Sequence, residues 1–224
     1  MIKRFLFSIC ILLLFSSLGH AQRVYSMRKA AQAQQTAETE TSVFVLSLKP
    51  GYHIYPSSGY YDSITNDTSH PVALNNMNGF TIGEELDWFV LPELSVSEEL
   101  DRYSGEIRYI GGGIFKQTVV PLLLTVKYWA FNNRIVKPYI GTGIGAYFID
   151  RRYTQNTVTE QSSTQLGYHM VVGISFVVNK SIRVGIEDRY AWAQALENSI
   201  LNPLILANTD DGGNSTDVFI SINL

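Results

Sequence analysis

Residues 165–178 read QLGYHMVVGISFVV, and apolar side chains occupy every second position from Leu166 to Val178. The positions between them are mostly glycine or polar, for example Gln165 and His169. A period of two places alternate side chains on opposite faces of a β-strand, whereas a helix brings every third or fourth residue onto one face. The segment is therefore predicted to be a strand with one apolar and one polar face.

The same alternation recurs from residue 42 to residue 224, in segments of about ten residues separated by turn-forming residues. It predicts eight strands, at residues 43–55, 79–90, 94–103, 118–131, 137–151, 165–178, 182–193 and 215–224. The connections are alternately short (91–93, 132–136 and 179–181) and long and polar (56–78, 104–117, 152–164 and 194–214). An even number of short strands, with turns at one end and long loops at the other, is typical of outer-membrane β-barrels.

The direction of the apolar face distinguishes two kinds of barrel, because a lipocalin-like barrel buries that face and a membrane barrel exposes it. The polar face carries Gly141, Gly143 and Gly145, which make room inside a narrow barrel. Aromatic residues gather near strand ends, as in the belts at two lipid–water interfaces. The predicted belt residues are Trp88, Tyr128, Trp129, Tyr168, Tyr190 and Trp192. We therefore predict an all-β fold, an eight-stranded antiparallel up-and-down transmembrane β-barrel with short periplasmic turns and long external loops.

The first 21 residues have the pattern of a secretory signal peptide, in which Lys3 and Arg4 precede an apolar run and small side chains precede the cut. The apolar run is too short to cross a bilayer as a helix. Residues 22–41 are predicted to form a flexible or weakly helical periplasmic extension, with a plug that enters the barrel as the alternative. Residues 42–224 form the predicted barrel, with both termini in the periplasm.

The composition excludes several classes of function. The 224 residues carry a formal net charge of −3 without a block of Lys or Arg, which gives no electrostatic basis for binding nucleic acid. The single cysteine, Cys10, lies in the predicted leader, so we expect no disulfide and no thiolate metal site in the exported chain. No close histidine spacing supports another metal site, and no motif points to a cofactor.

Residues 121–128, PLLLTVKY, are followed after a short turn by residues 137–147, KPYIGTGIGAY. These segments resemble the small porin-like outer-membrane barrels of Gram-negative bacteria, the eight-stranded proteins of the OmpA, OmpX and OmpW kind. The resemblance implies a location in the outer membrane, with outer-membrane lipid and the barrel-insertion machinery as partners. Small solutes or surface ligands are the further candidate partners.

Odd-numbered positions face the lumen in this fold, and many of them are charged. Charges in a narrow tube are unfavourable unless they are paired, so we expect linked ion pairs with trapped water. We expect Lys49 near Asp87, and Arg183 or Arg189 near Asp217. The predicted polar network comprises Lys49, His53, Glu85, Asp87, Glu99, Asp101, Lys127, His169, Arg183, Glu187, Arg189 and Asp217.

Strict alternation places the carboxylates of Glu84, Glu98 and Asp188 on the lipid face. A hairpin centred on Leu91 also sets Glu84 opposite Glu98. Carboxylates that face hydrocarbon are unfavourable, so we expect a β-bulge between each of these residues and its acidic neighbour, turning one acid of each pair inward. A subunit contact or a bound cation is the alternative.

The predicted role is that of a porin-like barrel, either a structural scaffold or a narrow passage for small solutes, and the narrow lumen favours a plugged scaffold. The alternative is an adhesion or surface-binding barrel that acts through residues 56–78 and 194–214. A lipid-modifying enzyme comes third. His53 and His169 could face each other across the lumen, but no motif sets a hydroxyl nucleophile beside them, and we expect no enzyme.

Overall fold

The computed structural model describes residues 44–224 except 56–70, 131–134 and 199–205, and it describes backbone alone at 194–198 and 206–210. In the described ranges, no helix is long and apolar enough to cross a membrane. The strands are β1 (Phe44–Ile54), β2 (Val72–Asn76), β3 (Gly79–Leu91), β4 (Leu94–Tyr109), β5 (Ile114–Trp129), β6 (Val136–Thr154), β7 (Val158–Val177), β8 (Ile182–Trp192), β9 (Gln194–Asn198), β10 (Leu206–Asp210) and β11 (Gly213–Asn223).

The predicted leader, residues 1–21, and the predicted periplasmic extension, residues 22–41, lie outside the described residues.

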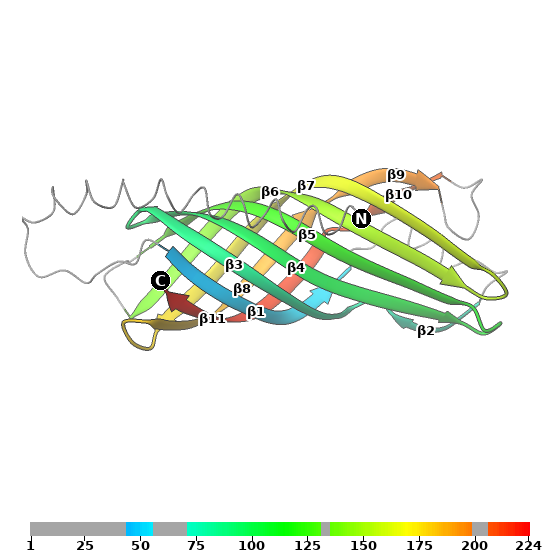
Figure 1. The fold of residues 1–224 in the computed structure, drawn as a ribbon, viewed down its shortest axis with the longest axis horizontal. Coiled ribbons are helices and arrows are strands. Elements are labelled where there is room, and N and C mark those ends of the chain that lie inside the picture. The colour runs from blue at the N-terminus through cyan, green and yellow to red at the C-terminus, as the bar shows by residue number, and fades with distance from the viewer. Residues whose placement is uncertain (1–43, 56–70, 131–134, 199–205) are drawn as a thin grey trace, which may run out of the picture. The chain divides into compact units, whose positions relative to one another are not determined.

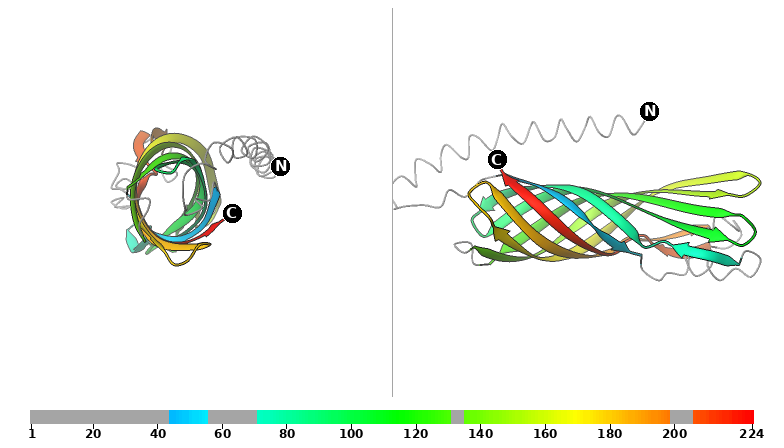
Figure 2. Two further views of the ribbon diagram at one scale, coloured as in Figure 1. Left: turned by 90° about the vertical axis from the view of Figure 1, so that its left-hand side faces the viewer. Right: turned by 90° about the horizontal axis from the view of Figure 1, so that it is seen from below.

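Eight of the strands close into an antiparallel barrel in the order β1, β3, β4, β5, β6, β7, β8, β11 and back to β1. Figure 2 shows the closed ring end-on, and Figure 1 shows the strands tilted along the barrel. Followed from partner to partner around the ring, the register leaves β1 at Phe44 and returns at Ile54, ten residues farther along. The predicted eight-stranded antiparallel barrel is confirmed.

Burial alternates along the barrel strands, with odd-numbered side chains inside and even-numbered side chains outside. The pairing passes through Glu84, Glu98 and Asp188 without a register shift. The bulges expected at these acids are therefore absent, and all three carboxylates stay on the outer face. The regular alternation on either side of each acid fixes the register too firmly for a bulge to form there.

The β3–β4 hairpin also differs from its expected register. Glu84 pairs with Leu100, and Glu98 pairs with Leu86, so the two glutamates do not face each other directly. The pairing is centred one residue farther along the chain than expected, on Pro92, because the turn contains an irregularity after Phe89. The two carboxylates are consequently diagonal neighbours on adjacent strands.

The expected long loops contain much additional strand. Residues 104–117 and 152–164 are hairpins, in which β4 and β5 or β6 and β7 continue almost to the turn. β2 lies within 56–78, and β9 and β10 lie within 194–214. The two hairpins were missed because many of their outward side chains are polar, which hides the apolar stripe while the period of two continues. We call residues 103–109, 114–121, 147–154 and 158–167, together with β2, the strand extension.

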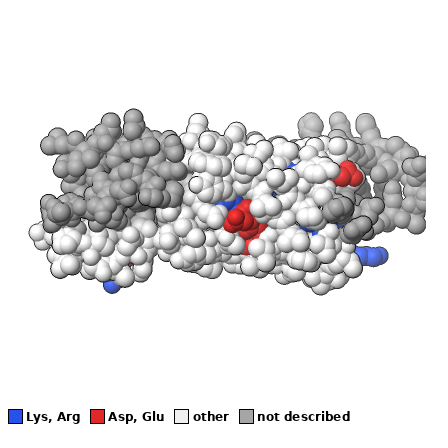
Figure 3. Space-filling model, turned by 180° about the vertical axis from the view of Figure 1, so that it is seen from behind, with Lys and Arg blue, Asp and Glu red and all other residues white. Residues whose placement is uncertain are grey.

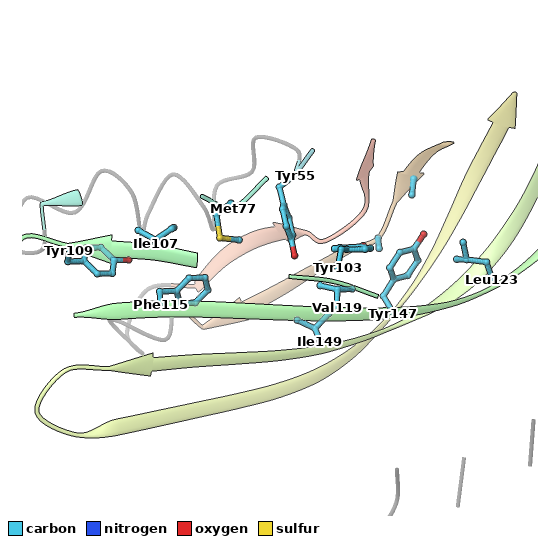
Figure 4. Close-up of a cluster of buried hydrophobic side chains, with 12 residues drawn as sticks. Tyr55, Met77, Tyr103, Ile107, Tyr109, Phe115, Val119, Leu123, Tyr147 and Ile149 are labelled. Atoms are coloured by element: carbon cyan, nitrogen blue, oxygen red, sulfur yellow. The ribbon is translucent and has the colours of Figure 1, made fainter. Parts of the chain in front are cut away.

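The strand extension encloses an apolar core. Ile107, Phe115 and Val119 are completely buried in it, and Tyr103 and Tyr147 belong to the same cluster. Figure 4 shows these side chains pointing into one common space from their strands. This part of the molecule therefore has the apolar interior of a water-soluble barrel.

Candidate functional site

The lumen beneath this core holds a dense cluster of charged side chains. All 12 side chains predicted for the polar network lie inside the barrel, and none is more than 4% exposed. We call eight of the ion-paired members the charged layer: Lys49, Glu85, Glu99, Asp101, Lys127, Glu187, Arg189 and Asp217.

Lys49 stands at the centre of the charged layer. Its Nζ lies 2.5 Å from Glu187, 2.8 Å from Glu99 and 3.2 Å from Glu85. The carboxylate oxygens of these glutamates lie within 4.8 Å of one another, which is a donor set suited to a hard metal ion. The lysine ammonium contacts all three carboxylates and offsets part of their charge. The expectation that Lys49 lies near Asp87 was wrong, because the register places Asp87 opposite a position four residues away, nearer the turn end of β1.

A second cation supports the same carboxylates. The Lys127 Nζ lies 2.6 Å from Glu85, 3.3 Å from Glu187 and 3.9 Å from Asp87. The Tyr139 hydroxyl donates a hydrogen bond of 2.8 Å to Glu187. Buried carboxylates with several charge-assisted partners are held rigidly, because any movement would expose an uncompensated charge to a low-dielectric interior.

Arg189 completes the layer on its other side. Its guanidinium donates to Glu99 at 2.6 Å and to Asp101, and it lies 4.0 Å from Asp217. Of the two arginines considered for Asp217, Arg189 is therefore the one beside it. Arg183 lies nearer the short turns, with its guanidinium over an aromatic ring at 5.6 Å.

Glycine makes the space that these long side chains occupy. A Cβ atom at Gly51 would collide with the carboxylate of Asp217, and one at Gly83 would collide with that of Asp101. Both glycines escaped the sequence analysis, although their odd numbers place them on the lumen face. The predicted lumen glycines, Gly141, Gly143 and Gly145, line the inner face of β6, where a Cβ would meet neighbouring side chains and carbonyls.

A second polar layer lies at the level of the strand extension, and it was not predicted as a linked network. The Arg151 guanidinium lies 2.6 Å from Asp211, and the side-chain amides of Gln117 and Gln165 donate to the same carboxylate at 2.7 and 2.8 Å. The Tyr103 hydroxyl donates to the Asp211 carbonyl oxygen at 2.8 Å. Arg151 and Gln165 lie within predicted strands at odd positions. Gln117 and Asp211 lie in segments expected to be loops, where continuing the odd-numbered alternation would have placed them inside.

The two lumen histidines do not form a catalytic constellation. His53 Nδ1 lies 2.8 Å from the Ser215 hydroxyl, and His169 Nε2 lies 2.8 Å from the Thr125 hydroxyl. Among the described residues, Nδ1 of His169 has no hydrogen-bond partner. Nucleophilic catalysis needs a third group that orients the base, so these pairs are best described as lumen lining.

The outer surface carries an apolar band. Figure 3 shows a broad uncharged region on one side of the molecule, interrupted by a patch of acidic atoms about halfway along. The band is built from exposed aliphatic side chains at even positions, including Leu48, Leu124, Ile140, Val172, Ile186 and Val218. A closed barrel that is polar inside and apolar outside matches a bilayer and not water.

Comparison with known proteins identifies the fold. No protein-family model and no curated protein matches the chain. It is similar to the outer membrane protein OprG of Pseudomonas aeruginosa, with a TM-score of 0.58 and 11% identity over 83% of this chain and 98% of OprG. It is also similar to Neisserial surface protein A, with a TM-score of 0.52 and 12% identity over 81% of this chain and 96% of that protein.

The chain has the fold of the small eight-stranded outer-membrane β-barrels. The recognised resemblance and the transmembrane barrel are thereby confirmed, and the apolar band supports the outer-membrane location from this chain's own side chains.

The aromatic residues predicted to form belts on this outer-membrane barrel face outward, with one exception. Trp129 is 4% exposed, and its indole Nε1 donates a hydrogen bond of 2.8 Å to Ser95 inside the lumen. Its assignment to a belt was wrong, because its odd number turns it inward whatever its distance from the turn. The other predicted belt residues lie on the outward face: Trp88, Tyr128, Tyr168, Tyr190 and Trp192.

Proposed function

We propose that this protein is a sealed outer-membrane barrel, a scaffold that displays the strand extension and does not conduct solutes. The charged layer carries the proposal. Three cations and five carboxylates from six strands meet in a lumen that is narrow in any eight-stranded barrel. A passing ion would have to separate these buried pairs, which is strongly unfavourable.

Two further closures support the proposal. Toward the short turns, Trp129 and Tyr139 pack with ring centroids 4.3 Å apart, in a cluster that includes Phe89 and Phe219. Toward the strand extension, the apolar core and the Arg151–Asp211 layer fill the interior. A solute would therefore meet three differently built barriers in series.

Conductance in planar bilayers tests the sealed lumen. Folded wild-type protein, verified by heat-modifiable migration on a gel, is expected to give no discrete current steps, while a large porin in the same bilayers serves as the positive control. Reproducible ion-selective steps from the folded wild-type barrel would contradict the proposal and favour the narrow passage.

Surface binding is the second candidate, and one observation favours it. Within the described chain, residues 158–164 of β7 form strand pairs with β6 only, since pairing with β8 begins at Tyr168. Across the described residues, β9 pairs only with β10. Residues 158–164 on this edge of β7 carry one charge, Glu160, and no proline, so their sequence would not block an extended peptide from adding to it.

A selection of random 12-residue peptides against the barrel in lipid nanodiscs tests this candidate. Of the neighbouring residues Ser162 and Ser163, one points its N–H toward β6 and the other points it toward the open edge. Recovered peptides are expected to lose binding when proline replaces the serine whose N–H points toward the open edge. That variant keeps its fold, whereas proline at the other serine breaks the pairing with β6. Equal binding to the wild type and to the folded proline variant would contradict strand addition.

A further inference from the structure

The outward carboxylates lie at one depth in the membrane. The register advances ten residues over eight strands, so paired residues on adjacent strands do not lie at the same height. In the direction from β3 to β4, the paired residue lies slightly more than one residue farther from the short-turn end. The position level with Glu84 therefore lies just below its partner Leu100, beside Glu98. In the opposite direction, the chain of paired residues runs from Glu84 through β1 and β11 to Val184 on β8. The residue of β8 at the same depth as Glu84 lies nearly four residues farther from the short-turn end, which is Asp188.

This depth is the middle of the apolar band. Glu84 lies halfway along β3 between Phe80 and Trp88, which are exposed aromatic residues toward its two ends. Glu98 is flanked across the strands by Leu86 and Leu124. Hydrocarbon offers no hydrogen-bond partner to either carboxyl, so an isolated barrel leaves both groups in an unfavourable setting.

Other polar groups at this depth are satisfied within the barrel. Asp188 accepts a hydrogen bond of 2.9 Å from the Thr216 hydroxyl. The Thr142 hydroxyl donates to a backbone carbonyl at 3.0 Å. For Glu84 and Glu98, by contrast, no hydrogen bond or ion pair forms with any residue that the structure describes. The β3–β4 face is thus the place where the outer wall carries unpartnered carboxyls.

We propose that the β3–β4 face is an interface with a second copy of this chain, in which Glu84 of each protomer pairs with Glu98 of the other. Outer-membrane barrels insert in one orientation, so a two-fold axis of a dimer runs along the membrane normal and preserves depth. Because Glu84 and Glu98 lie at equal depth on neighbouring strands, such an axis between them places Glu84 of one protomer opposite Glu98 of the other, and Glu98 opposite Glu84. Hydrogen bonds between the paired carboxyl groups then form away from lipid.

A second copy fits this face better than a cationic partner from the same chain. In the described parts of the chain, Arg102 is the one basic side chain on the outer face of the band, and it lies higher, opposite Ile82. The surrounding side chains are Leu48, Leu86, Leu100 and Leu124, which supply an apolar rim around the paired carboxyls. Helices and strands in lipid associate through such polar contacts combined with close packing.

Cysteine cross-linking in vesicles at low protein density tests the interface. The one native cysteine lies in the predicted leader, so Leu86→Cys introduces a single thiol beside the proposed axis. The matched control is Ile186→Cys, an exposed position on β8 at nearly the same depth. We expect a dimer band from Leu86→Cys and none from Ile186→Cys.

Added to Leu86→Cys, the double substitution Glu84→Leu with Glu98→Leu is expected to reduce the dimer roughly tenfold or more. The double substitution Glu84→Gln with Glu98→Gln is instead expected to keep the dimer, since side-chain amides also form hydrogen bonds with each other. Asp188→Leu, which removes the internally satisfied carboxylate, is expected to leave it unchanged. Heat-modifiable migration verifies that each variant is folded.

Three outcomes would overturn the proposal. The first is the absence of a Leu86→Cys dimer in vesicles that contain folded protein, and the second is equal cross-linking at residues 86 and 186. The third, observed in native outer membranes, is a Leu86→Cys adduct with a different polypeptide in place of the second copy. A silent conductance experiment is compatible with any of them, so this test is independent of the sealed lumen.

Discussion

The membrane-spanning part of the barrel and the strand extension share one backbone pattern and have opposite polarity. Along β5, the outward side chains change from Leu124 and Val126 to Lys116. The inward side chains of the same strand change from the charged Lys127 to the fully buried Phe115. Both parts keep odd positions inside, so the strand geometry is continuous while the medium around it changes from lipid to water.

The comparison shows that alternation specifies the strand, and that the polarity of each face reports its surroundings. In lipid, the outer face must be apolar and the lumen can hold charge if every charge is paired. In water, the same tube needs an apolar interior for its stability. A stretch whose alternation inverts therefore marks the height at which a barrel leaves the membrane.

The largest expected effect comes from the charged layer. Lys49→Met removes the cation between Glu85, Glu99 and Glu187, and is expected to destabilise the barrel by about 3–5 kcal/mol, because breaking a buried ion pair leaves uncompensated charge. Urea unfolding in detergent micelles, followed by tryptophan fluorescence, measures it. A loss below about 1 kcal/mol would show that the lumen is hydrated enough to solvate the glutamates.

The apolar core of the strand extension gives the next effect. Ile107→Ala is expected to remove about 3 kcal/mol, because it leaves a cavity in a packed interior. The damage should be local, so hydrogen exchange is expected to increase in the strand extension and to stay slow in the membrane-spanning strands. Ile144→Ala, on the lipid face, is the control and should leave exchange in the extension unchanged. Uniform acceleration in both parts would contradict the division into two regions.

The second polar layer should be sensitive to the loss of one charge. Asp211→Asn keeps the shape and weakens the bonds from Arg151, Gln117 and Gln165, which predicts a loss of about 2 kcal/mol for charge-assisted hydrogen bonds. Protease cleavage of the strand extension in intact cells measures the loosening. Cleavage that matches the wild type would indicate that the carboxylate charge is not needed to hold the extension together.

The smallest effect belongs to the outer surface of the extension. Hydrogen bonds from Arg108 and Lys116 lower the pKa of Glu106, so their contribution to stability is present at neutral pH and is lost as the pH falls through that lowered pKa. Arg108→Ala is expected to cost less than about 1 kcal/mol at pH 7, because the pair is exposed. The free energy of unfolding is measured for variant and wild type at pH 7 and at pH 3, and the difference between the two proteins should be smaller at pH 3. A difference that grows on acidification would contradict the sign.

The eight strands could be predicted from the sequence because the phase of the alternation never changes within the barrel strands. The same phase also identified the lumen side of Lys49 and Glu187 and the outer side of Leu124. The identity of each ion pair could not be predicted, because partners such as Lys49 and Glu187 belong to strands that are not hydrogen-bonded neighbours, and they meet across the lumen. Cross-lumen distances depend on the stagger of the whole ring, which no single strand encodes.

Three of the errors share one cause, which is that composition was given more weight than phase. Trp129 was placed in a belt for being aromatic near a turn, although its phase is inward. The acids at 84, 98 and 188 were expected to bulge because lipid disfavours them, although their phase is outward. Residues 104–117 were taken for a loop because they are polar, although Ile107 and Phe115 continue the inward phase.

Spin-label accessibility along the outward positions of β5 tests the central claim most directly. Labels at residues 116, 118, 122, 124 and 126 are compared for collisions with oxygen, which concentrates in lipid, and with a water-soluble nickel chelate. We predict that the nickel chelate dominates at 116 and 118, and that oxygen dominates at 122, 124 and 126. Oxygen-dominated accessibility at all five positions, or nickel-dominated accessibility at 124, would contradict the inversion of polarity along the barrel.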